Sequence, residues 1–252
     1  MRIDLNSDLG ESFGAWPMGQ DAALMDSITS ANVACGFHAG DPGVMRQTLA
    51  LAKDKGVAVG AHPGFPDLVG FGRREMKATP AEVHDLVLYQ VAALAGMAAA
   101  QGLKLQHVKA HGALYNMACK ERSLADAIAR AVAAFDRSLI LFGLPNSELV
   151  RAGAAAGLTV AAEVFADRAY ERDGSLTSRN TPGSVIHDEG AVVERAVRMV
   201  KRRDVVAVDG SVIALQADTI CLHGDTPGAA ALARVVRRGL ESAGVVIAAL
   251  GT

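Results

Sequence analysis

The stretch Asn32-Val33-Ala34-Cys35-Gly36-Phe37-His38-Ala39-Gly40-Asp41-Pro42 decides the fold that this sequence predicts. It reads as the end of an apolar strand, then a histidine among glycines, then a helix start with Asp41 as N-cap and Pro42 at the first helical position. A histidine also follows a predicted strand at His62, His111 and His223. Four of the seven histidines therefore stand where a strand ends.

This alternation of strands and helices predicts an α/β protein with about seven β/α units. We expect a closed or nearly closed (β/α)7-type, TIM-like barrel, in which the loops after the strands share one face. An open, doubly wound sheet is the alternative. A chain of this length usually forms one core, so residues 1–252 are predicted to be a single domain. The pair Asp209-Gly210 predicts a β-hairpin near 204–215 with a type I′ turn.

Composition excludes several classes of partner. The net charge is -2, with 25 basic and 27 acidic residues interspersed, so no basic face is predicted for nucleic acid or an anionic membrane. The 3 cysteines match no zinc or redox spacing, which suits a reducing compartment. No leader pattern and no membrane-spanning apolar run is seen, so we expect a cytoplasmic protein.

Charged side chains also follow the predicted strands. Asp8 comes after a first strand expected at about residues 2–6. His107, Lys109 and His111 alternate along another strand, which directs all three to one side, the barrel interior. A lysine there is costly unless it meets a carboxylate, an anion or a ligand. We expect Lys109 and His111 in a site and His107 in the core.

A later strand, predicted at Leu158–Val164, carries Glu163 and leads to Arg168, whose guanidinium suits a substrate carboxylate. An ion pair between Asp167 and Arg168 is the alternative. The loop 63–74 is long and rich in Gly and Pro, and 171–190 is irregular. Both segments are predicted to lie over the rim of the site.

The sequence contains no P-loop, no dinucleotide-binding glycine motif and no nucleophile elbow. What remains supports general acid–base hydrolysis, with or without a metal ion. The predicted catalytic residues are Asp8, His38, His62, Lys109 and His111, and the predicted substrate-binding residues are Asn32, Gly36, Glu163, Arg168, His223 and Asp225.

Six runs together resemble the LamB/YcsF family of bacterial 5-oxoprolinase subunits: residues 4–11, 32–42, 60–74, 109–116, 163–170 and 222–226. Two positions depart from the family pattern, Ala110 in place of a proline and Thr177 in place of a more apolar residue. The resemblance implies a barrel similar to glycoside hydrolase and deacetylase barrels. It also implies ATP-dependent opening of the lactam 5-oxo-L-proline to L-glutamate, in a complex with subunits B and C.

Within this resemblance, Asp8 or His62 would activate water, His111 would protonate the leaving nitrogen and Lys109 would stabilise the oxyanion or phosphate near the Gly36 backbone. Arg168 would hold the substrate carboxylate. ATP would be a co-substrate that the partner subunits use to activate the lactam. Two alternatives stay open. One is a metal-dependent carbohydrate deacetylase or amidase, in which Asp8, His38 and His62 or His111 hold a divalent ion. The other is a lactam-binding subunit without catalysis. Self-association also stays open.

Overall fold

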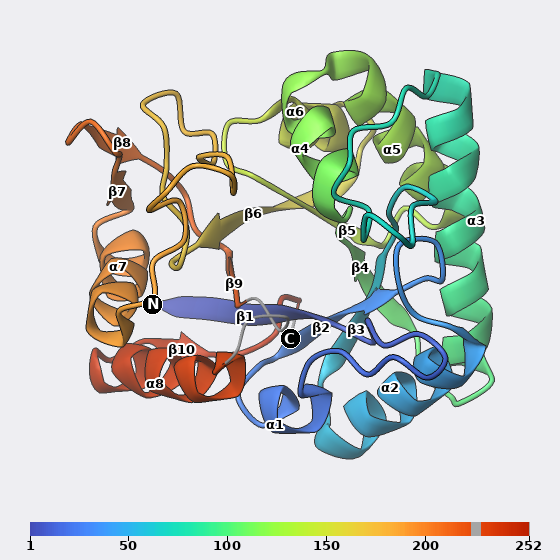
Figure 1. Cartoon of the computed structure of the whole chain (residues 1–252), viewed down its shortest axis with the longest axis horizontal. Coiled ribbons are helices and arrows are strands. Elements are labelled where there is room, and N and C mark those ends of the chain that lie inside the picture. The colour runs from blue at the N-terminus through green and yellow to red at the C-terminus, as the bar shows by residue number, and fades with distance from the viewer. Residues whose placement is uncertain (223–227, 252) are drawn as a thin grey trace.

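Seven parallel strands close into a barrel in the computed structural model, which describes residues 1–222 and 228–251 (Figure 1). The hydrogen-bonded order is β1-β2-β3-β4-β5-β6-β9, and β9 pairs again with β1, with Leu5 opposite Ile220. The strands are β1 (Arg2–Leu9), β2 (Ser30–Ala34), β3 (Ala58–His62), β4 (Leu105–Val108), β5 (Ile140–Gly143), β6 (Thr159–Phe165) and β9 (Thr219–Cys221). The predicted barrel is confirmed, and the open sheet is wrong because both edges pair with each other.

A short eighth strand, β10 (Val246–Ile247), pairs with β1 outside the closed ring, opposite Arg2 and Ile3. It extends the first strand at its amino end, where β9 does not reach. This strand occupies only Val246 and Ile247 of the apolar run 245–250.

Helices cover the outside of the barrel, as Figure 1 shows. They are α1 (Asp21–Met25), α2 (Pro42–Lys55), α3 (Pro80–Ala99), α4 (Gly112–Lys120), α5 (Arg122–Phe135), α6 (Glu148–Ala155), α7 (Glu189–Lys201) and α8 (Ala229–Ser242). Helix α2 begins where the sequence predicts, because the Asp41 carboxylate accepts hydrogen bonds from the Gly43 and Val44 amides at 2.7 and 2.9 Å. It ends at Gly56, whose φ of 67° is the left-handed C-cap conformation.

The main apolar core lies between the strands and the helices, and the barrel interior is largely polar beside a small apolar cluster of Ile140, Phe142 and Ala161. Buried aliphatic residues of the helices, such as Leu49, Leu94 and Ile128, pack in one cluster with those of the strands. Inside the barrel, the Asp4 carboxylate accepts hydrogen bonds from the hydroxyls of Ser30 and Thr219 at 2.7 and 2.5 Å. Polar side chains thus fill the space that aliphatic layers fill in an ordinary barrel.

This polar interior explains why the first strand is longer than predicted. Its alternate residues Asp4, Asn6 and Asp8 point inward and hydrogen-bond with other strands, for example Asn6 Nδ2 with Thr219 Oγ1 at 2.7 Å. A polar run reads as a loop in the sequence, yet here it forms a strand through Leu9.

The expected hairpin is present as β7 (Asp204–Val206) and β8 (Val212–Ala214), but the predicted type I′ turn is wrong. That turn needs a positive φ at both central residues, and in this loop only Gly210 has one, at 83°. The Gly210 amide donates to Ala207 O, which makes a three-residue loop. Asp209 instead accepts hydrogen bonds from the amide and hydroxyl of Ser211.

Among residues 1–222 and 228–251, no helix combines the length and apolar character needed to cross a bilayer.

Candidate functional site

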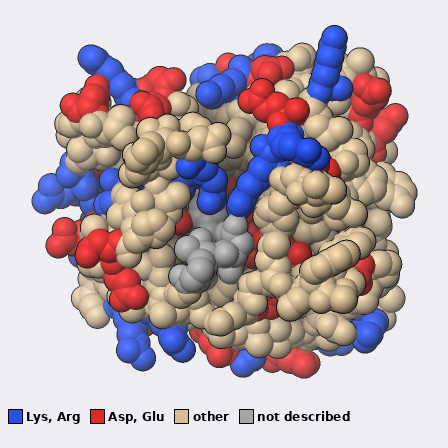
Figure 2. Space-filling view, viewed as in Figure 1, with Lys and Arg blue, Asp and Glu red and all other residues tan. Residues whose placement is uncertain are grey.

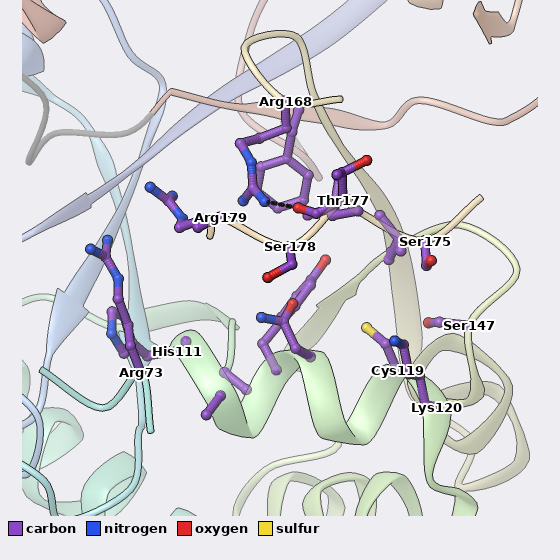
Figure 3. A pocket seen from close by; sticks show the side chains of 18 of the residues that line it. Arg73, His111, Cys119, Lys120, Ser147, Arg168, Ser175, Thr177, Ser178 and Arg179 are labelled. Atoms are coloured by element: carbon purple, nitrogen blue, oxygen red, sulfur yellow. Dashed lines mark hydrogen bonds between the residues drawn. The ribbon is translucent and has the colours of Figure 1, made fainter. Parts of the chain in front are cut away.

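A pocket of about 810 Å³ opens at the carboxyl ends of the strands (Figure 3). Asp8 of β1, His62 of β3, and Lys109 and His111 after β4 line it. The loop after β3, helix α4, the turn after β5 and the irregular segment after β6 form its other walls, which places both predicted rim segments at the site. Four of the five predicted catalytic residues therefore meet in one pocket, although they are spread over more than a hundred positions of the chain.

Lys109 lies at the base of the pocket between two carboxylates. Only 3% of the residue is exposed, and its Nζ lies 2.8 Å from Asp8 Oδ1, 2.9 Å from Glu163 Oε1 and 3.0 Å from Cys221 Sγ. Burial acts to lower the pKa of Lys109, but its negative neighbours, Asp8 first, raise that pKa well above the ordinary value. The site thus holds a permanent ammonium charge at the pocket wall.

A hydrogen-bonded chain behind Asp8 fixes its position. Asn32 Nδ2 donates to Asp8 Oδ1 at 2.8 Å and to Asn6 Oδ1 at 2.7 Å. Asn32 Oδ1 in turn lies 2.7 Å from His107 Nε2. Burial, and then the charge of Lys109, lowers the pKa of His107 to about 3, so this ring is neutral and donates through Nε2. His107 is the core histidine that we expected.

Gly60 provides the space that the His107 ring occupies, and this allows a sharp test. A Cβ at Gly60 would lie 2.2 Å from two atoms of the ring. We expect Gly60→Ala to lower the free energy of unfolding by about 1–3 kcal/mol through overpacking. A displaced His107 ring would also lose its hydrogen bond to Asn32, and Asn32 would then no longer fix the position of Asp8. Urea denaturation measures the first effect.

Gly96→Ala is the matched control, because nothing lies within 4 Å of a Cβ there and the residue sits in α3. This substitution should stabilise the protein by up to about 1 kcal/mol, since alanine favours helix. Equal effects of the two substitutions would contradict the packing argument.

Beside Lys109, two imidazoles face each other. His62 Nδ1 lies 2.7 Å from Lys109 O and His111 Nε2 lies 2.8 Å from Phe71 O. Carbonyl oxygens only accept, so each of these nitrogens carries a proton. The other two nitrogens, His62 Nε2 and His111 Nδ1, are 2.9 Å apart. If both rings are neutral, neither of these two nitrogens carries a proton, and each can only accept a hydrogen bond. A proton or a cation between them would therefore satisfy both.

Two more buried groups complete a cluster that could hold a metal ion. Glu11, His38, His62 and His111 each offer one ligand atom, and these atoms all lie within 4.8 Å of one another. Neither ring nitrogen of His38 has a hydrogen-bond partner among the described residues. Burial, followed by the charge of neighbouring histidines, lowers the pKa of His38 and of His111 well below the ordinary value. Their nitrogens are therefore available as neutral ligands.

The ring arrangement limits which residues can share one ion. His38 stacks on His111 with ring centroids 3.7 Å apart and planes 3° from parallel. Lone pairs lie in the ring planes, and these two planes are nearly parallel and separate, so one ion can lie in both planes only after one ring turns. Glu11 Oε1 lies 3.7 Å from His111 Nδ1. Asp8, the carboxylate of the sequence prediction, is not one of these four residues, but its Oδ1 lies 3.4 Å from His62 Nε2 and so borders the same position.

The loop after β3 packs directly on these rings. The left-handed φ of 61° at Gly72 is one reason for a glycine there, and a Cβ would also lie 2.7 Å from His38 Cβ and 2.9 Å from His111 Cδ2. Asp67 holds the loop by accepting hydrogen bonds at 2.9 Å from the Gly70 amide and from Arg74 Nε. The turn thereby presents the Phe71 carbonyl to His111.

Only some of the predicted substrate-binding residues line the pocket. Asn32 and Glu163 lie behind Asp8 and Lys109 and do not line the pocket. Gly36, with a φ of 91°, forms the turn before His38. Arg168 lines the pocket. His223 and Asp225 lie outside the described residues.

Sequence reasoning missed several members of this site. Glu11 was not among the predicted site residues, and neither were Asn6, Cys221, Arg73 and Arg179. The alternation of Asp4, Asn6 and Asp8 was a signal for an inward-facing strand. Cys221 and the two arginines carry no such signal.

Comparisons with known proteins agree over the whole chain. The A subunit of 5-oxoprolinase from Bacillus licheniformis is 55% identical over 100% of this chain and 99% of its own length. The protein of the same name from Rhodopseudomonas palustris is 57% identical over 98% of both chains.

The structural comparison is equally complete. The crystal structure of a "Lactam Utilization Protein" from Thermus thermophilus has a TM-score of 0.95 and 52% sequence identity, and covers 99% of this chain and 100% of that one. The LamB/YcsF family model matches residues 3–252. This barrel, with its polar interior and its buried lysine and histidines, is therefore a member of the LamB/YcsF family.

Proposed function

We propose that this chain is the A subunit of an ATP-dependent 5-oxoprolinase, which hydrolyses the ring amide of 5-oxo-L-proline to give L-glutamate. The names of its full-length relatives support this assignment. The structural observation that carries it is the ammonium of Lys109, held 2.8 Å from Asp8 beside His62 and His111 at the pocket wall. Amide hydrolysis needs such a fixed charge and a nearby proton donor.

The residues divide the chemistry in a way that their contacts support. The Asp8 side chain is 13% exposed and accepts hydrogen bonds from Lys109 and Asn32, so it stays ionised and can orient a water molecule. Lys109 would stabilise the negative charge that develops on the carbonyl oxygen. His111 is bonded to Phe71 through Nε2, and its lowered pKa leaves Nδ1 without a proton, so Nδ1 would take a proton from the attacking water and pass it to the leaving nitrogen.

ATP and two partner subunits complete the proposed reaction. Subunits B and C would transfer the γ-phosphoryl group of ATP to the amide oxygen and release ADP. Water then adds to the ring carbon, and the carbon–nitrogen bond breaks with its electron pair on nitrogen, which takes a proton. A second water releases phosphate from the resulting acyl phosphate and leaves glutamate. The lack of a nucleotide motif in this sequence fits that division of labour.

Glutamate formation from oxoproline and ATP tests this function. We expect turnover only when this chain is mixed with subunits B and C, and we expect Asp8→Asn to abolish that turnover while the chain still folds. Full turnover with Asp8→Asn and with His111→Gln would instead support a chain that binds the lactam without catalysing its hydrolysis.

The histidine cluster favours a second candidate, a metal-dependent amidase or carbohydrate deacetylase. Three imidazoles and one carboxylate suit zinc or another first-row transition ion better than magnesium. Glu11, His62 and His111 would hold the ion, with His38 joining if its ring turns. A bound ion would supply an acidified water and polarise a carbonyl.

Cobalt(II) titration of the purified chain tests the cluster. We expect about one equivalent to bind, with visible absorption from nitrogen ligands, and we expect Glu11→Gln to weaken binding about tenfold or more. Lack of binding would contradict the ligand assignment. Amide or N-acetyl hydrolysis that needs the ion but no ATP would favour the second candidate. ATP-coupled turnover that survives 1,10-phenanthroline would favour the first.

A further inference from the structure

Three arginines from separate segments meet at one end of the pocket. Arg73 comes from the loop after β3, Arg168 follows β6, and Arg179 belongs to the irregular segment that follows. Figure 3 shows the guanidinium ends of Arg73 and Arg179 extending toward each other, with Arg168 beside them. In the surface view, basic side chains likewise reach toward the middle of this face (Figure 2). We call these three residues the arginine cluster.

Arg168 is the fixed member of the arginine cluster. Only 5% of the residue is exposed. Its Nη2 donates to Thr177 O at 2.6 Å and its Nε to Ser184 O at 3.3 Å. Among the described residues, its remaining nitrogen, Nη1, has no hydrogen-bond partner. The side chain is thus held rigidly while one of its donor groups is left for a ligand.

The three charges oppose one another. Burial first, and then the charge of Arg179, lowers the pKa of Arg168 to about 10, and Arg73 acts in the same direction. The charge of Asp167 offsets only part of this effect. Arg168 is buried, whereas Arg73 and Arg179 are exposed, so an anion that reaches all three would relieve the repulsion felt by the buried guanidinium.

Four other carboxylates line the pocket, those of Asp8, Glu75, Glu171 and Asp173, and two of them feel a nearby lysine. Asp8 is bound to Lys109 at 2.8 Å, and the charge of Lys120 acts on Asp173. Hydroxyl groups of Ser175 and Ser178 line the same pocket and can donate hydrogen bonds to an anion. At about 810 Å³ the pocket also suits a drug-sized ligand rather than a bare five-membered lactam.

We propose that the arginine cluster binds a phosphate group carried by the molecule on which this site acts. Guanidinium groups bind phosphate oxygens in a bidentate manner, and several guanidiniums match the two negative charges of a phosphate ester better than the single charge of a carboxylate. Resting on the proposed function, the carrier is the phosphorylated lactam. The carboxylate role predicted for Arg168 then becomes part of a larger anion site.

Calorimetric titration of the isolated chain with inorganic phosphate tests the arginine cluster without any turnover. We expect saturable binding that Arg179→Ala weakens about tenfold or more, and Arg73→Ala similarly, because each removes a charge-assisted hydrogen bond. Both residues are exposed, so both variants should fold. Arg172→Ala is the matched control, since Arg172 is an exposed arginine of the same segment that does not line the pocket.

A second titration, with ADP, separates the two sources of phosphate. Affinity for ADP no greater than for phosphate supports the phosphorylated lactam, whereas much tighter ADP binding would overturn that carrier and assign the site to a nucleotide. The proposal of a phosphate site fails if phosphate does not bind, or if the Arg179, Arg73 and Arg172 variants bind it equally. Neither titration depends on glutamate formation, so both can still be interpreted if the proposed function proves wrong.

Discussion

Replacing Lys109 by methionine is expected to lower kcat/KM for oxoproline in the reconstituted complex by about a thousandfold or more. Among the described residues, the substitution removes the cation that lies within 3 Å of both Asp8 and Glu163 and that can stabilise an oxyanion at the pocket wall. It also leaves the buried Glu163 and the partly buried Asp8 without their shared cation, which costs about 3–5 kcal/mol of folding free energy. Steady-state kinetics and chemical denaturation measure the two effects separately.

A double variant separates the structural part of this loss from the catalytic part. In Lys109→Met with Glu163→Gln, one positive and one negative charge are removed together, so stability should largely return while activity stays absent. Lys104→Met is the matched control, because Lys104 is exposed and lies outside the pocket. Recovery of turnover in the double variant would show that Lys109 serves only the fold.

The pair His62→Asn and His111→Gln is expected to lower turnover by about a hundredfold to ten-thousandfold in each case. Each replacement is chosen to keep one contact. Asparagine can still donate to Lys109 O in place of His62 Nδ1, and glutamine can still donate to Phe71 O in place of His111 Nε2. Each removes the nitrogen that faces the other ring across 2.9 Å. The loss therefore reports on these two facing atoms.

Cobalt binding, measured on the same two variants, should fall together with turnover if the facing nitrogens hold an ion. If they serve only in proton transfer, turnover should fall in both variants, and the ATP-coupled turnover of the unaltered chain should not respond to chelators. His84→Asn is the control, since His84 lies near the start of α3 beside Asp85, far from the pocket lining. Unchanged turnover in both cluster variants would contradict a catalytic role.

The sequence was sufficient for the architecture because local signals agreed with the global fold. The Asp41 cap, the helix start at Pro42 and the strand before His62 each match the structure within a few residues. The inward direction of Lys109 followed from the two-residue period of a strand, and its contact with Asp8 bears this out. Strand-end histidines converge for a topological reason, since parallel strands end on one face.

The rest of the site depends on loop conformation, which local patterns do not determine. Phe71 presents its carbonyl to His111 from a φ of 54°, a conformation that a non-glycine residue adopts only under tertiary constraint. Arg73 and Arg179 meet across about a hundred residues of chain, and no periodicity links them. The hydrogen-bond partners of polar strand residues such as Asn6 come from distant strands, so the local sequence does not predict them either.

Closure of the ring between β1 and β9 has a consequence for biosynthesis. Leu5 finds its partner Ile220 only after most of the chain has been made, so the first strand leaves the ribosome with one hydrogen-bonding edge unmet. The ion pair of Asp8 and Lys109 likewise lacks the contact between Lys109 Nζ and Cys221 Sγ until β9 is in place. A translation product that ends before β9 would therefore be inactive and prone to aggregate. During synthesis, activity should appear only after β9 has been made and has paired with β1.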